Sequence, residues 1–167
     1  MNLIHYRSLR VMIFISTTLL ANIDCFSQNL SLNDLVRIKK GSVSQANDLL
    51  IERGWEFDTS SVNFIRFTLN RDRNLAQGWL SIQKFSYEDD KPNISSVSYE
   101  FFEHNSFNFI REKCVSLGMK KVDAGANPGS YSTTYEGATL DAILYQIREE
   151  GDEFPRYKVL MLDKFID

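Results

Sequence analysis

The residues best suited to covalent chemistry in this chain are one histidine and one cysteine. Beyond residue 27 the sequence contains His104 and Cys114 and no other residue of either type. A cysteine and a histidine can act together as a nucleophile and its base, and Glu103 or Asp141 could orient the imidazole. This pair defines one enzymatic hypothesis, a small exported hydrolase that uses Cys114.

The helix that would carry both residues argues against that chemistry. Cys114 falls between Ile110 and Leu117 on one apolar stripe at helical spacing, and an unpaired cysteine in such a stripe behaves as a small buried hydrophobe. His104 stands at the predicted start of the helix, where the helix dipole opposes the positive charge that a general base acquires. We therefore expect a core cysteine, a surface histidine and no catalytic residue.

Metal and carboxylate chemistry find little support in the sequence. One histidine and one cysteine cannot supply the ligands of a zinc site. Two acidic segments, residues 88–90 and 149–153, offer oxygen ligands for calcium, but neither has the spaced pattern of an EF-hand loop, and solvated turns are the favoured interpretation. No glycine-rich phosphate loop or Gly-x-Ser-x-Gly elbow is present. We expect neither metal nor cofactor, and a hydrolase that uses paired carboxylates stays an alternative.

Aromatic side chains are the more promising functional material. The chain holds twelve phenylalanines, seven tyrosines and two tryptophans, and most of them alternate as strand residues that fill a core. Some strands are apolar on both faces, so one face of a sheet is expected to pair with another surface or to bind a partner. Because tyrosine combines apolar area with a polar end, the candidate binding residues are Trp79, Tyr87, Tyr99, Tyr131, Tyr135 and Tyr145.

The N-terminus has the features of an export signal. Arg7 and Arg10 precede an apolar run at residues 11–21, and small residues follow near position 27. We expect residues 1–27 to be a cleaved signal peptide. Retention as an anchor, or lipidation at Cys25, remain alternatives. The exported chain would keep a single cysteine, which excludes an intrachain disulfide.

Two helices and a set of strands are predicted for the first part of the exported chain. Residues 30–40 and 42–53 have helical apolar spacing, and Ser42 with Gln45 forms a capping box at the start of the second helix. Gly54 is placed to end that helix. Alternating apolar residues then predict strands at residues 55–58, 62–70, 75–87 and 94–102.

The second part repeats this order. A helix is expected from residue 105 or 106 to Gly118, followed by strands at residues 119–122, 131–135, 139–148 and 157–165, with a loop at residues 123–129. Gly54 and Gly118 lie 64 residues apart, and Pro92 and Pro155 lie 63 apart. This register favours a tandem duplication. Short polar turns between the strands favour antiparallel meanders.

The predicted fold class is therefore α+β, with two tandem units of a helix packed on an antiparallel meander sheet. The units span residues 28–103 and 104–167, and they could form one continuous domain. The last strand is apolar on both faces at residues 159–162, so we expect it to be central and covered on both faces.

Tandem units of a helix and four strands resemble the secreted β-lactamase inhibitor protein fold, in which two such repeats form one concave sheet. The opening, residues 30–57 with its Gly-Trp-Glu-Phe end, is similar to short exported bacterial proteins of unknown function.

Charge and composition limit the partners. The net charge of −3, without a stripe of lysine and arginine, argues against nucleic acid and anionic membranes. The expected function is therefore a non-enzymatic binding protein of the periplasm or extracellular space, with a protein or a surface polymer as partner. A self-associating structural subunit, possible as a homodimer, is the other alternative.

Overall fold

The computed structural model describes residues 29–69, 77–85 and 93–164. The predicted signal peptide, including Cys25, lies outside the described residues, as do Tyr87 and the acidic segment at residues 88–90. No helix in the described ranges is long and apolar enough to cross a membrane.

Two short helices open the fold, and each begins with a capping box. In α2 (Leu32–Lys40) the Ser31 hydroxyl accepts a hydrogen bond from the Asp34 amide, and the Asp34 carboxylate accepts one from the Ser31 amide. In α3 (Val43–Glu52) Ser42 and Gln45 make the same reciprocal pair, as the sequence predicts. These bonds satisfy backbone donors that the first turn of a helix leaves unpaired.

Four strands follow, and the order of elements then repeats. After α3 come β1 (Trp55–Ser60), β2 (Phe64–Leu69), β3 (Gly78–Phe85) and β4 (Asn93–Phe101). The second series is α4 (His104–Ser116), β5 (Lys120–Asn127), β6 (Ser130–Glu136), β7 (Leu140–Ile147) and β8 (Arg156–Asp163). The helix–four-strand order predicted twice is therefore confirmed, with α2 as an additional helix in the first unit.

Strand β5 corrects one expectation. Residues 123–129 were expected to form a loop, but the strand continues to Asn127, and the turn is confined to Pro128 and Gly129. Asp, Ala, Gly and Asn have low strand propensity, yet residues 123–127 all pair with β6. Pairing with a neighbour outweighs the local preference here.

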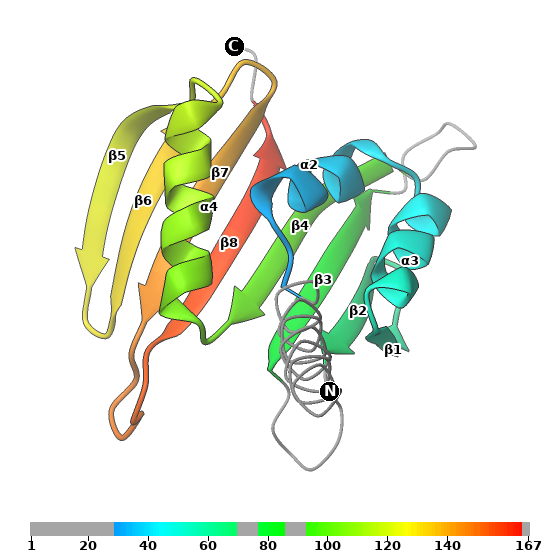
Figure 1. Cartoon of the computed structure of the whole chain (residues 1–167), viewed down its shortest axis with the longest axis horizontal. Coiled ribbons are helices and arrows are strands. Elements are labelled where there is room, and N and C mark those ends of the chain that lie inside the picture. The colour runs from blue at the N-terminus through cyan, green and yellow to red at the C-terminus, as the bar shows by residue number, and fades with distance from the viewer. Residues whose placement is uncertain (1–28, 70–76, 86–92, 165–167) are drawn as a thin grey trace, which may run out of the picture.

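The eight strands of the described ranges form one antiparallel sheet. Their order is β1-β2-β3-β4-β8-β7-β6-β5, so the last strand of each unit pairs with the last strand of the other (Figure 1). Strand β8 is therefore central, as its apolar sequence predicts. The two units are parts of one continuous sheet.

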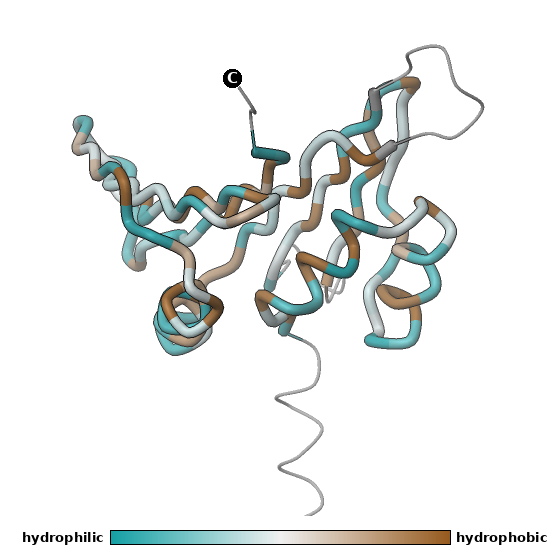
Figure 2. The backbone as a smooth tube through the Cα atoms, turned by 90° about the horizontal axis from the view of Figure 1, so that it is seen from above, coloured by the Kyte–Doolittle hydropathy of each residue, from teal (hydrophilic) through white to brown (hydrophobic). Residues whose placement is uncertain are grey.

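The three helices of the described ranges, α2, α3 and α4, lie on one side of this sheet (Figure 2). Helix α2 packs on β4 and β8, where the units meet, and α3 packs on β1. Helix α4 is fixed by Phe107, whose ring stacks on Tyr157 of β8 with centroids 4.7 Å apart. The core fills the space between the helices and this face of the sheet. The expectation that β8 is covered on both faces is wrong, because no described helix lies on the other side.

Candidate functional site

The uncovered face of the sheet is the candidate functional site. Side chains of a strand alternate between its two faces, so the positions between the core residues point away from the helices. On β4 the buried residues Val97, Tyr99 and Phe101 belong to the helix-covered face. Ser98 and Glu100 therefore lie on the opposite side, which we call the uncovered face.

A row of directly paired residues crosses the centre of the uncovered face. Trp79 on β3 pairs with Glu100 on β4, Glu100 pairs with Lys158 on β8, and Lys158 pairs with Tyr145 on β7. Three strand spacings separate Trp79 from Tyr145, which corresponds to about 14 Å between their Cα atoms. We call these four residues the central row.

Ion pairs occupy the middle of the central row. The Lys158 ammonium lies 3.2 Å from one Glu100 oxygen, and an Arg156 guanidinium nitrogen lies 3.8 Å from the other. Arg156 also donates to Glu149 at 2.5 Å. The side chains of Glu100, Lys158 and Arg156 are partly exposed, and the side chain of Glu149 is more exposed than these three. The charges are thus held in fixed positions on the surface and are largely neutralised by one another.

Apolar side chains surround these charges. The Trp79 ring meets Phe102 edge to face, with centroids 5.9 Å apart. Ile143 and Ile147 lie beside Tyr145 on β7, and Leu160 lies on the same face of β8; all are partly exposed. Apolar and aromatic area around a charged centre is the composition of a recognition surface.

Of the six predicted binding residues, the structure describes five and divides them into three groups: the central row, an exposed ring on the helix-covered face, and the core. Trp79 and Tyr145 lie together in the central row. Tyr131 is 65% exposed, but its register opposite Gln146 places it on the helix-covered face near the edge of the sheet. Tyr87 lies outside the described residues.

For Tyr99 and Tyr135 the expectation of an exposed binding position is wrong. Both are core residues: Tyr99 is fully buried against Trp55 and Phe101, and Tyr135 is buried near Cys114. Burial raises the pKa of both tyrosine hydroxyls. Neither ring can contact a partner without unfolding.

Sequence reasoning missed Glu100, Lys158, Arg156 and Phe102. The signal that could have found them is their position between buried residues, since Glu100 separates Tyr99 from Phe101 and Lys158 separates Tyr157 from Val159. A charged residue between two buried ones in a central strand must point to the other face.

The cysteine and histidine are not arranged as a catalytic pair. Cys114 is fully buried, and burial raises the pKa of its thiol to about 11. The His104 Nδ1 atom lies 2.8 Å from the Tyr157 hydroxyl. Of the two groups considered for orienting His104, Glu103 accepts hydrogen bonds from Asn29 and Ser106, and Asp141 accepts one from the Gly137 amide.

We expect the Cys114 thiol to resist labelling in the native protein. With a pKa of about 11, roughly 0.1% of the thiol is ionised at pH 8, and the thiolate is the reactive form. Reaction with an aromatic disulfide reagent should be at least about a hundredfold slower than in denaturant. Equal rates in the two conditions would contradict the buried position. Above pH 10, the rate at which the native protein is labelled should rise because more of the thiol is ionised.

Within the described ranges, no group of three or more His, Cys, Asp or Glu side chains is close enough to hold a metal ion. The acidic segment at residues 149–153 is a turn in which the Asp152 carboxylate accepts from the Glu149 amide, and Glu149 pairs with Arg156. The Glu149 and Asp152 carboxylates thus have protein partners.

Comparisons with family models, curated proteins and solved structures found no match to this chain.

Proposed function

We propose that this protein is exported and acts without covalent chemistry, by binding a partner protein through the uncovered face. The observation that carries the proposal is the central row, in which Trp79 and Tyr145 flank the Glu100–Lys158 ion pair. The features of residues 1–27 support export.

The composition of the face favours a protein over a surface polymer. Tryptophan, tyrosine and arginine dominate the binding energy of protein interfaces, and the face presents all three around one centre. Its fixed charges of both signs can set the orientation of a partner with complementary charges.

The aromatic ends of the central row are expected to supply most of the affinity. Replacing both Trp79 and Tyr145 with alanine should weaken binding by at least about tenfold, because truncation of an interface aromatic at a hot spot costs on the order of 2 kcal/mol. The measurement is crosslinking and pull-down with the exported chain, residues 28–167, from an envelope extract of its source, read by mass spectrometry.

Two variants control for general surface effects. Tyr131→Ala and Phe154→Ala remove exposed rings that lie off the central row, so they should retain the partner. The proposal fails if the double variant of Trp79 and Tyr145 has the same unfolding midpoint as the unchanged protein and captures the partner equally well. Recovery of the protein as its own dimer would favour the self-associating subunit instead, and recovery of a polysaccharide would favour the polymer.

A further inference from the structure

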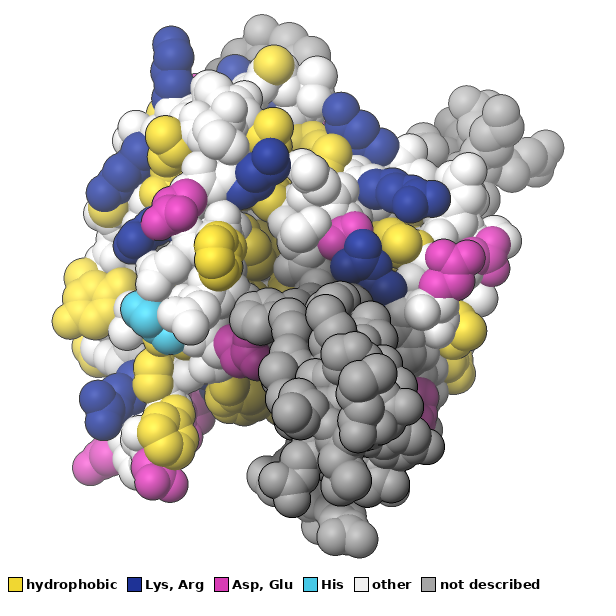
Figure 3. All heavy atoms as spheres, in the orientation of Figure 1, with side chains coloured by type: hydrophobic (Ala, Val, Ile, Leu, Met, Phe, Trp, Pro, Cys, Tyr) yellow, Lys and Arg dark blue, Asp and Glu magenta, His cyan; other side chains and the backbone are white. Residues whose placement is uncertain are grey.

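A cavity lies on the opposite side of the sheet, between the start of α2 and α4. Its volume is about 300 Å³. The buried side chains of Leu30, Leu32 and Ile110 contribute to its lining, and the exposed Phe109 ring forms part of its wall. In Figure 3, apolar side chains reach the surface over α4 and toward α2, among lysine and arginine side chains.

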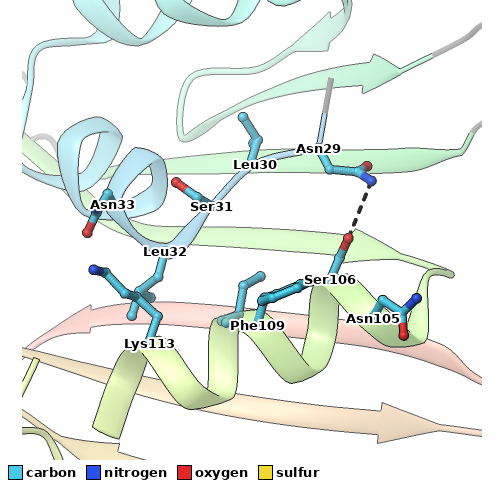
Figure 4. A pocket seen from close by; sticks show the side chains of 10 residues that line it. Asn29, Leu30, Ser31, Leu32, Asn33, Asn105, Ser106, Phe109 and Lys113 are labelled. Carbon is cyan, nitrogen blue, oxygen red and sulfur yellow. Dashed lines mark hydrogen bonds between the residues drawn. The ribbon is translucent and has the colours of Figure 1, made fainter. Parts of the chain in front are cut away.

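Lys113 is the charged residue of the lining. In the part of the chain that the structure describes, no carboxylate lies within 4 Å of its ammonium group, whereas Lys39, Lys158 and Lys164 all have acidic partners. Figure 4 shows Lys113 and Leu32 close together at one end of the cavity, with Phe109 between Lys113 and the other end. The cavity thus joins an apolar interior to a positive charge.

Polar groups close the other end. The Asn29 side chain donates to the Ser106 hydroxyl at 3.3 Å (Figure 4). It also donates to the Glu103 carboxylate at 2.6 Å. Ser106 also donates to Glu103 at 3.0 Å. Because Glu103 places a negative charge at this end, an anionic group would be repelled there and attracted to Lys113. The charges therefore define the direction in which an amphipathic molecule would lie.

We propose that this cavity binds a small amphipathic anion, a carboxylate attached to a short apolar chain or ring. Its volume is at the lower limit of ordinary ligand pockets, and an apolar lining with a few polar groups is typical of them. The carboxylate would contact Lys113, and the apolar part would lie against Leu32, Ile110 and Phe109. The site is separate from the uncovered face, so it stands independently of the proposed function.

Three eight-carbon probes of equal length test the charge requirement: octanoate, 1-octanol and octylammonium. Isothermal titration of the exported chain, residues 28–167, is expected to give octanoate a dissociation constant on the order of 100 µM. Octanol should bind about tenfold more weakly, and octylammonium more weakly still. Absence of octanoate binding at millimolar concentration, or tighter binding of octanol than octanoate, would overturn the proposal.

Two pairs of variants locate the site. Lys113→Met should weaken the binding of octanoate by about tenfold and leave the binding of octanol unchanged. Its control is Lys120→Met, which replaces an exposed lysine elsewhere. Phe109→Ala should weaken the binding of both probes, whereas Phe154→Ala should change the binding of neither. Both phenylalanines are 66% exposed, so the two variants lose similar amounts of exposed surface. If Lys113→Met preserves the preference for octanoate over octanol, the anion is bound elsewhere and the proposal is wrong.

Discussion

Replacing Tyr99 with alanine is expected to lower the free energy of unfolding by about 3–5 kcal/mol, the usual cost of removing a large aromatic ring from a core. The ring is fully buried. It meets Trp55 edge to face at 5.8 Å and stacks on Phe101 at 4.5 Å. The substitution would leave a cavity between the Trp55 and Phe101 rings. Urea or guanidinium unfolding, followed by tryptophan fluorescence, measures the change.

Two other substitutions test the origin of that loss. Tyr131→Ala removes a ring that is 65% exposed, so its effect should stay within about 0.5 kcal/mol. Tyr99→Phe removes only the hydroxyl, whose hydrogen bond to Asn29 is long at 3.4 Å, and should cost about 1 kcal/mol or less. If Tyr99→Ala were as stable as Tyr131→Ala, the packing of β4 under the helices would be contradicted.

The same comparison shows why Tyr99 is unsuitable for testing partner binding. A variant that unfolds loses its partner whatever surface it uses. Trp79 and Tyr145 are partly exposed on the uncovered face, so their removal can change affinity while the protein stays folded. The stability measurement on Tyr99 therefore supports the choice of variants in the binding experiment.

The order of helices and strands could be predicted because its signals are local. The capping box of Ser42 and Gln45 depends on residues three positions apart. Gly54 and Gly118 end their helices with φ angles of 77° and 75°, a backbone conformation that favours glycine. Alternating apolar residues then predict the strands of the first unit.

The extent of β5 could not be predicted because its cause is not local. Ala124, Gly125 and Ala126 have no preference for a strand, and they are extended because β6 supplies their hydrogen-bond partners. The pairing of β4 with β8 also has a cause that is not local. Strands more than 50 residues apart pair there, and the sequence shows that both are apolar but not that they are neighbours.

The sequence pattern assigns only some of the aromatic residues to a face of the sheet. On β4, Val97 and Phe101 flank Tyr99 at a spacing of two, while Ser98 and Glu100 are polar, so the pattern itself assigns Tyr99 to the core. On β7 this rule gives no answer. Leu144 and Tyr145 are both suited to a core, and only the position of the helices shows that Leu144 is buried and Tyr145 is not.

The second large effect is expected at Lys39, a buried lysine that connects the two units. Its ammonium group donates to the Ile94 carbonyl on β4 at 2.7 Å and to the Asp163 carboxylate on β8 at 2.6 Å. Lys39→Met keeps most of the apolar stem and removes both hydrogen bonds. We expect a loss of about 2–3 kcal/mol in the free energy of unfolding, measured by denaturant titration.

The two partners of Lys39 should contribute unequally to that loss. Asp163 is 68% exposed in its side chain, against 3% for Lys39, so solvent screens the ion pair at its carboxylate end. The amide oxygen of an asparagine at this position can still accept from Lys39, and Asp163→Asn should therefore cost at most about 1 kcal/mol. The Ile94 carbonyl belongs to a buried residue and would lose a charged donor. Lys40→Met, a neighbouring exposed lysine, should change stability by less than about 0.5 kcal/mol. If Asp163→Asn proved as costly as Lys39→Met, the ion pair and not the carbonyl would hold α2 to the junction of β4 and β8.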